Sequence, residues 1–319
     1  MTRVLVTGAT GFVGSFLCEA LARADYRVRG ALRTDRVVPA AIGEKVIIGE
    51  INSTTDWTRA LDGVDAIIHA AARSHVLHPG TGPANLYFET NERGTERLAN
   101  AAARMQVQRL VYLSSIKANG EETVAHAYTP ADEPQPQDDY GLSKWRAEQH
   151  VAAASQGSGM QAVILRPPLV YGPGVRANFL RLLQWVHGGW PLPLGAVRNA
   201  RSLVSVWNLC DFLVLVLKHP QAPGRTWMVS DGEDLSTPDL IRRLGSAMGR
   251  QVLLPSVPVT LLKACAGLLG RRGELARLCG SLQVDISQTR AQLGWSPPVT
   301  VHESLARTVA WYLAAGRTS

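Results

Sequence analysis

The sequence has no apolar run long enough to cross a bilayer. The most apolar late stretch, residues 257–270, carries Lys263 and is shorter than the roughly 20 residues that a spanning helix needs. We expect it to form a helix of the core or of a smaller lobe, or an amphipathic surface helix, without stable membrane insertion. Met1-Thr2-Arg3 leads directly into a strand pattern with no apolar leader, which favours a cytoplasmic protein.

Cysteine is also scarce. The four cysteines, at positions 18, 210, 265 and 279, are widely separated, have apolar neighbours and form no Cys-x-x-Cys pair. This spacing matches neither a zinc site nor a redox dithiol, so we predict no metal site. Buried free thiols in a reducing compartment are the simplest interpretation.

Charge is not concentrated in any one segment. Lys and Arg number 33 against 26 Asp and Glu, a net charge of +7, yet there is no basic run and no basic stretch interleaved with aromatics. These absences argue against nucleic acid as a partner, and an anionic small molecule fits the modest positive charge better. With 46% hydrophobic and 18% charged residues, the composition is that of a folded globular protein.

The first strong pattern stands at the N-terminus. Residues 4–7 are an apolar run that predicts a buried parallel strand, glycines follow at positions 8, 11 and 14, and a helical pattern begins at Phe12. Glycine lets a backbone approach phosphates closely, and the start of a helix offers free N–H groups and a partial positive charge. Strand, glycine turn and helix in this order therefore predict a dinucleotide site.

Strands and helices alternate from there to about residue 172. Further strands are predicted at 26–33, 45–51, 64–72, 107–115 and 161–170. Helical patterns cover residues 85–105 and begin again at Tyr140. This alternation predicts an α/β fold with a doubly wound parallel sheet. We predict a nucleotide-binding domain over 1–172 and a smaller α/β substrate lobe over 173–319, with segments that return to the first domain.

Ser115, Tyr140 and Lys144 are the candidate catalytic residues. Ser115 ends a predicted strand, with Ser114 as the competing assignment, and Tyr140 and Lys144 share one face of a helix. A free tyrosine has a pKa of about 10, which a nearby ammonium should lower. The phenol would then exchange a proton with a hydroxyl or carbonyl that the serine holds, while a nicotinamide exchanges the hydride.

The segment Thr7-Gly8-Ala9-Thr10-Gly11-Phe12-Val13-Gly14, together with this Ser, Tyr-x-x-x-Lys set, resembles the extended short-chain dehydrogenase/reductase superfamily. The closest resemblance within it is to the nucleotide-sugar branch, the UDP-glucose 4-epimerase-like proteins, and it continues to Leu293-Gly294-Trp295. The resemblance implies a Rossmann-type sheet, a nicotinamide cofactor, a UDP-sugar substrate and a homodimer paired through two long helices.

The resemblance also implies a set of cofactor contacts. NAD-preferring members carry a carboxylate after the second strand, where this chain has Leu32-Arg33. A guanidinium can hold a 2′-phosphate, so NADP(H) is favoured, while Asp35 keeps NAD(H) open and a solvated Arg33 is the plainer alternative. The implied cofactor-binding residues are Gly8, Thr10, Gly11, Phe12, Val13, Gly14, Arg33, Glu50, Ile51, Ala70, Ala71, Asn91, Tyr140, Lys144 and Pro167.

Substrate contacts follow from the same resemblance. Asn178 and Arg201 match an Asn and an Arg that bind the substrate diphosphate, and Leu194 lies in the segment that holds the base. Ser115 and Ser74 are expected near the sugar, with His75 beside them. Asn178 as a helix cap and Arg201 as a surface residue are the structural alternatives.

Departures from the family pattern narrow the choice of reaction that the resemblance implies. Nucleotide-sugar 4,6-dehydratases carry Asp-Glu after the catalytic Ser/Thr, whereas this chain has Ile116-Lys117, so dehydration is disfavoured. The segment 166–169 lacks an Asn found in many epimerases. Residues 114–120 and 278–285 resemble a bacterial subgroup that includes reductases of UDP-4-keto-6-deoxy-N-acetylglucosamine, which form UDP-N-acetylquinovosamine for surface polysaccharide.

The sequence therefore favours a 4-keto reductase, because a reductase exchanges its cofactor at every turnover and NADPH is the usual donor. The alternative is a 4-epimerase of UDP-hexoses or UDP-N-acetylhexosamines, which keeps NAD bound. Steroid or flavonoid reduction is a further enzyme alternative. A non-catalytic NADP(H)-binding regulator is remote, because Tyr140 and Lys144 are both present.

Overall fold

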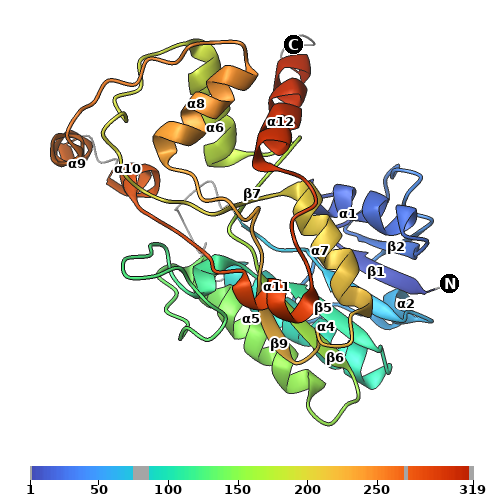
Figure 1. Ribbon diagram of the computed structural model, residues 1–319. Helices are drawn as coiled ribbons and strands as arrows, with labels where there is room; N and C mark the ends of the chain where they lie inside the picture. The colour runs from blue at the N-terminus through green and yellow to red at the C-terminus, as the bar shows by residue number, and fades with distance from the viewer. Residues whose placement is uncertain (1, 75–85, 269–271, 316–319) are drawn as a thin grey trace.

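Seven parallel strands form the central sheet of the computed structural model, which describes residues 2–74, 86–268 and 272–315 (Figure 1). The strands are β1 (Arg3–Thr7), β2 (Arg27–Leu32), β3 (Glu44–Ile47), β4 (Ala66–His69), β5 (Arg109–Leu113), β6 (Gln161–Arg166) and β9 (Arg225–Met228). Their order, β3-β2-β1-β4-β5-β6-β9, reverses direction at β1. The predicted doubly wound parallel sheet is confirmed, and its switch point lies beside the glycine turn.

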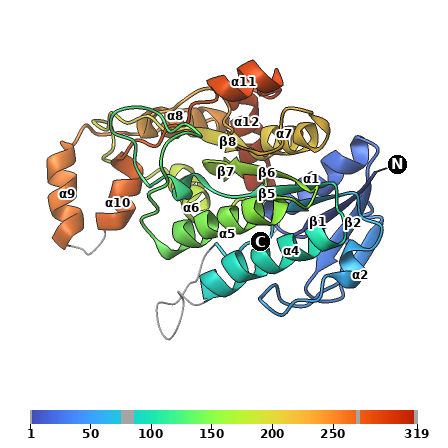
Figure 2. The same cartoon turned by 90° about the horizontal axis from the view of Figure 1, so that it is seen from below.

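Helices cover both faces of the sheet (Figure 2). On one face α1 (Phe12–Arg23) and α7 (Val206–Lys218) pack on a cluster that contains Val4 and Val6. On the other face α4 (Gly94–Arg104) and α5 (Asp139–Ser155) pack on a cluster that contains Leu5. Successive side chains of a strand point to opposite faces, so one apolar strand supplies both cores. The short α2 (Thr58–Leu61) adds to the second cluster.

The chain leaves the sheet after β6 and returns to it at β9. Between them lie β7 (Leu169–Tyr171), α6 (Ala177–Gly188), β8 (Leu203–Ser205) and α7, and β7 pairs with β8 in a separate two-stranded sheet. The later helices are α8 (Thr237–Ala247), α9 (Val259–Leu268), α10 (Arg272–Cys279), α11 (Ser287–Leu293) and α12 (Val301–Ala315). A third apolar cluster joins α6, α8 and α12 as the core of the lobe (Figure 1).

Several predicted elements are shorter or divided. The strand predicted over 45–51 ends at Ile47, before Gly49 turns the backbone with a φ of +72°. The strand predicted over 161–170 is β6 and β7, separated by Pro167 and Pro168, because proline has no N–H for a ladder. The helix predicted over 85–105 begins with a π-helical segment, η1 (Phe88–Arg93), that continues into α4.

The late apolar stretch forms α9, with Leu261 exposed. No helix within the described ranges is long and apolar enough to span a membrane. Cys18 and Cys210 are buried as predicted, whereas Cys265 is exposed on α9 and Cys279 is half-buried, so the prediction of four buried thiols is wrong for these two. An apolar sequence neighbourhood does not guarantee burial on a helix at the edge of a lobe.

Candidate active site

The glycine turn after β1 brings three backbone segments into close contact. Gly8 has a φ of +69°, and a Cβ added there would lie 2.9 Å from the Ala71 nitrogen. A Cβ at Gly14 would lie 2.0 Å from the Gly8 carbonyl oxygen. Gly11 begins α1 with no side-chain cap, and the first turn has no acidic residue. The first N–H groups of α1 are therefore available to an anion, as a dinucleotide pyrophosphate requires.

A chain of hydrogen bonds connects this turn to Asn91. Thr95 Oγ1 donates to the Asn91 carbonyl (2.6 Å), so its oxygen accepts from His69 Nε2 (2.9 Å). His69 Nδ1 then accepts from Thr7 Oγ1 (2.6 Å), whose oxygen accepts from the Ala71 N–H (3.1 Å). Since each hydroxyl has one hydrogen, His69 is the neutral Nε2–H tautomer. Burial, assisted by the charge of Lys144, lowers the pKa of His69 to about 3.

Asn91 joins the end of β4 to the helix that carries Tyr140. It lies buried in η1, where Oδ1 accepts from the Arg73 N–H (2.8 Å) and Nδ2 donates to the Arg73 carbonyl (3.0 Å). Nδ2 also donates to Ser143 Oγ (3.1 Å), which donates to the Tyr140 carbonyl (2.8 Å). π-helical turns are rare in proteins overall, and those that occur are often found at functional sites.

The two serines after β5 have different partners. Ser114 is buried, and its hydroxyl donates to the Glu148 carboxylate. Ser115 caps the short 3₁₀-helix η2 (Ile116–Ala118), where Oγ accepts from the Lys117 N–H (3.2 Å). A hydrogen bond between Ser115 and Tyr140 acts to lower the pKa of Tyr140. Of the two, Ser115 is thus the serine whose hydroxyl lies close enough to Tyr140 for both to hydrogen-bond one substrate oxygen.

Tyr140 and Lys144 lie one turn apart on α5. Lys144 is 1% exposed, its Nζ donates to the Leu113 carbonyl (2.6 Å), and it lies 4.2 Å from the centre of the Tyr112 ring. Burial lowers the pKa of Lys144 to about 7, although the charge of Glu148 opposes it. Burial raises the pKa of Tyr140 to about 12. This direction is opposite to the one expected from the sequence, because burial disfavours the charged form of both groups.

Sequence reasoning missed a buried ion pair below these residues. Arg166 Nε donates to Glu148 Oε1 (2.9 Å), Nη2 donates to Oε2 (2.5 Å), and Nη1 donates to Asn119 Oδ1 (2.9 Å). Both charged side chains are 5% exposed. The pair connects the end of β6 to α5, one turn beyond Lys144. The sequence did contain one sign of this pair, because Glu148 follows Tyr140 and Lys144 at four-residue spacing and so lies on the same helix face.

Two residues predicted to lie near the adenosine of the cofactor, Arg33 and Glu50, form an ion pair with each other. Arg33 Nε lies 3.1 Å from Glu50 Oε1, and the side chains are 68% and 53% exposed. Leu32 is buried, while Asp35 pairs with Lys45. Arg33 is thus near a carboxylate supplied by the turn after β3. This arrangement was invisible in the sequence, because it depends on the register between β2 and β3.

The remaining predicted cofactor residues lie in segments that follow the C-terminal ends of β1, β3, β4 and β6. Thr10, Phe12 and Val13 belong to the glycine turn and the first turn of α1, and Ala70 and Ala71 follow β4. Ile51 packs close to Gly94, where an added Cβ would lie 2.6 Å from Ile51 Cγ2. Pro167 follows β6, and its carbonyl accepts from the Ile116 N–H (3.0 Å).

The predicted substrate residues come mainly from the lobe. Asn178 is exposed in the first turn of α6 and is not its N-cap, which is Arg176. Leu194 is buried, and Arg201 Nη1 donates to the Gly280 carbonyl (2.8 Å). Ser74 is exposed, and His75 lies outside the described residues. Within those residues, no hydrogen bond or ion pair joins Asn178 or Arg201 to Tyr140.

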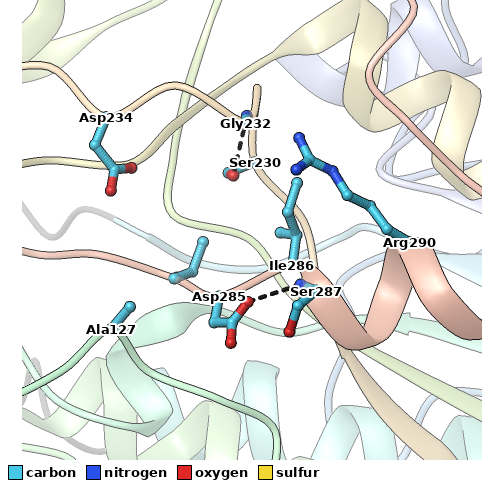
Figure 3. A pocket seen from close by; sticks show the side chains of 9 residues that line it. Ala127, Ser230, Gly232, Asp234, Asp285, Ile286, Ser287 and Arg290 are labelled. Atoms are coloured by element: carbon cyan, nitrogen blue, oxygen red, sulfur yellow. Dashed lines mark hydrogen bonds between the residues drawn. The ribbon is translucent and has the colours of Figure 1, made fainter.

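A pocket of about 260 Å³ lies beyond β9, at the start of α11 (Figure 3). Arg290 points toward Gly232 in this view, and Asp285 accepts from the Ser287 N–H (2.7 Å). The lining residues are Ala127, Ser230, Gly232, Asp234, Val284, Asp285, Ile286, Ser287 and Arg290. None of them is a predicted site residue, so this pocket is separate from the candidate catalytic set.

Comparison with known proteins agrees with this geometry. Residues 4–230 match the model of the NAD dependent epimerase/dehydratase family. A UDP-glucose 4-epimerase from Vibrio cholerae is 42% identical over 316 residues, which cover 98% of this chain and 96% of that protein. A 3-beta-hydroxysteroid dehydrogenase from Mycolicibacterium neoaurum is 28% identical over 341 residues, 97% of this chain and 91% of that protein.

A solved structure shows the same fold. It is a UDP-glucuronic acid 4-epimerase from Bacillus cereus in complex with UDP-glucuronic acid and NAD, with a TM-score of 0.78 and 24% identity. The match covers 98% of this chain and 100% of that chain.

Proposed function

Because the chain belongs to the NAD-dependent epimerase/dehydratase family of short-chain dehydrogenase/reductase enzymes, we propose that it inverts C4 of a UDP-sugar, as a 4-epimerase. The observation that carries the proposal is the 42% identity, over nearly the whole of both chains, to a UDP-glucose 4-epimerase. The proximity of Ser115 to Tyr140 and Lys144, and the hydrogen-bond chain from the glycine turn to the helix that carries them, support it. A bound nicotinamide would accept the C4 hydride and return it to the opposite face.

The chain's own residues would move the proton. Tyr140, with a pKa raised to about 12, is protonated at neutral pH and can donate to a 4-keto oxygen. The reverse step needs the phenolate, which the ammonium form of Lys144 would stabilise. Ser115 would hold the same sugar oxygen. Arg201 and Asn178 would bind the diphosphate, with Leu194 near the base and Ser74 near the sugar.

A 4-keto reductase that uses NADP(H) is the second candidate, and one observation favours it. No carboxylate stands directly after β2, at the position of Leu32-Arg33, and Arg33 is exposed where a 2′-phosphate would need a cation. The Glu50 carboxylate competes for that guanidinium, so NADP(H) binding requires Arg33 to exchange partners. The nucleotide sugar would then be a 4-keto sugar, such as the precursor of UDP-N-acetylquinovosamine.

Identification of the cofactor separates the two candidates. The purified protein would be denatured and any released nucleotide identified by mass spectrometry. Stoichiometric NAD, followed by C4 inversion of UDP-glucose or UDP-N-acetylglucosamine, is the expected result. If the protein is purified free of nucleotide and binds added NADPH reversibly, the result would favour the reductase. Failure to bind either nucleotide would contradict both.

We also propose a cytoplasmic homodimer paired through α4 and α5. These helices pack side by side on one face of the sheet. Arg146 and His150 of α5 lie 3.5 and 3.7 Å from the carboxylate of Glu92, which belongs to η1 just before α4. Light scattering at several protein concentrations would test it, and a monomer at all of them would contradict it.

A further inference from the structure

We propose that Lys117 is a positioning residue: its ammonium holds the carboxylate that caps α5 and thereby sets Tyr140 against Ser115. The proposal rests on the proposed function, because Tyr140 and Ser115 are taken as its catalytic pair. Lys117 follows Ser115 by two residues, and Asp138 precedes Tyr140 by two. A link between Lys117 and Asp138 therefore joins the two catalytic segments directly.

The contacts of Lys117 form that link. Its Nζ donates to Asp138 Oδ2 (2.5 Å) and to Glu121 Oε1 (2.6 Å). The side chains of Lys117 and Asp138 are 29% and 38% exposed, so the pair is less screened by water than an ordinary surface pair. One ammonium thus binds the segment after Ser115 to the start of the catalytic helix.

Asp138 uses its second oxygen to begin α5. Oδ1 accepts from the Gly141 N–H (2.7 Å), which makes Asp138 the N-cap of the helix. Gly141 in turn lies against η2, since a Cβ there would be 2.5 Å from the Lys117 carbonyl oxygen. The first turn of α5 and the turn after Ser115 are therefore joined by backbone packing and by charge, with Tyr140 between Asp138 and Gly141.

The ion pair also places the Lys117 ammonium beside a carboxylate whose charge acts on Tyr140. The Asp138 carboxylate acts to raise the pKa of Tyr140, as does Tyr87, although burial is the largest cause. Burial acts to raise the pKa of Asp138 itself, but hydrogen bonds from Lys117 and Gly141 outweigh it and lower that pKa. Likewise, hydrogen bonds to Asp138 and Glu121 outweigh burial and raise the pKa of Lys117. Both partners are thus charged at neutral pH.

Two substitutions separate this role from simple support of the fold. Lys117→Met leaves the Asp138 charge uncompensated, so the pKa of Tyr140 should rise. Asp138→Asn removes that charge but keeps a good N-cap, so the pKa of Tyr140 should fall. Each shift should be about 0.5 to 1 unit, the size expected for one charge at partly screened distance. A purely structural role predicts the same direction in both variants.

The titration can be followed without any assay of activity. Protein containing 3-fluorotyrosine, whose phenol is more acidic, would be titrated by ¹⁹F NMR, and Tyr140→Phe would assign the signal. Lys117→Arg should restore wild-type behaviour. Arg242→Met is the matched control, because it removes an exposed ion pair with Asp239 on α8. Circular dichroism would check folding, with Lys117→Gln as a substitute if the Met variant unfolds.

Opposite shifts in the two variants, with no shift in Arg242→Met, would support the proposal. Shifts in the same direction, or none, would overturn it. In enzyme assays Lys117→Met should lower kcat about tenfold and leave the KM for cofactor unchanged. Opposite NMR shifts in a protein that turns over no UDP-sugar would contradict the proposed function alone, since they would still show that the Lys117–Asp138 pair acts on Tyr140.

Discussion

At the scale of single residues, the candidate site combines the buried Lys144 with the half-buried Tyr140, and desolvation shifts the pKa of both groups. Lys144 is held by one carbonyl and an aromatic ring, and its pKa of about 7 means that it gains or loses its charge near neutral pH. Tyr140 is shifted the other way, to about 12. Under the proposed function, the phenol would therefore be the proton donor at rest, and the charge of Lys144 would set how readily the phenolate forms.

Tyr140→Phe should lower turnover of the sugar substrate by a factor of about 10² to 10⁴, the usual contribution of a positioned acid–base group. The reason is that only the hydroxyl is lost, while the ring keeps its contact with Tyr87. Steady-state kinetics would measure this, with cofactor binding followed by fluorescence and Tyr312→Phe as control. Turnover within twofold of wild type would remove Tyr140 from its role.

His69→Gln tests the neutral imidazole. The folded pKa of about 3 lies below the ordinary value of 6.5, so the unfolded chain binds more protons between those values. Stability should therefore be complete above pH 6.5 and fall as pH decreases toward 3. The variant should lose about 1 to 3 kcal/mol at pH 7.5 and depend less on pH below 6.5. Urea unfolding at pH 7.5 and 5 would measure both, and an unchanged pH slope would contradict the assignment.

At the scale of elements, the contact that matters most is the approach of α1 to the turn after β1. Gly14→Ala would place a methyl group against the Gly8 carbonyl at 2.0 Å, so the turn must move. We expect a loss of about tenfold or more in cofactor affinity and about 1 to 3 kcal/mol in stability. Calorimetric titration and thermal unfolding would measure these.

Gly273→Ala in α10 is the control for this change, because nothing lies within 4 Å of its added Cβ. It should be neutral or slightly stabilising. Equal effects of the two substitutions would show that the close approach at Gly14 has no special role.

The sequence predicted the elements whose signal is local. The glycine turn, the alternation of apolar strands with helices, and the spacing of Ser115, Tyr140 and Lys144 are all visible within short windows. The Arg166–Glu148 pair and the Arg33–Glu50 pair were not, because each joins segments that only the fold brings together. The direction of the Tyr140 pKa was also missed, because burial cannot be judged from spacing.

At the scale of the whole molecule, the two halves of the chain share one sheet. The boundary at residue 172 remains a prediction, but β9 and α7 from the second half complete the sheet and cover one face. The strand β9 gave no sequence signal, because Arg225–Met228 is short and its first two residues are polar.

A fragment of residues 1–172 should therefore not unfold cooperatively. It lacks β9, one of the two strands that pair with β6, and the apolar residues that α7 contributes, among them Leu209, Phe212 and Leu213. Near-UV circular dichroism and thermal unfolding, with the full-length chain as reference, would measure this. A sharp transition in the fragment would show that the first half is an independent unit.

The detour of the chain between β6 and β9 has a consequence for synthesis on the ribosome. From Arg166, the last residue of β6, to Met228, the last of β9, the ribosome must add 228 − 166 = 62 residues. At 5 to 20 residues per second this takes about 3 to 12 s. Throughout that interval the nascent sheet ends in β6, five of whose six residues are buried in the finished protein, with unpaired N–H and C=O groups along its edge. During translation we therefore expect chaperones to bind at this strand, and stalled chains to aggregate through it.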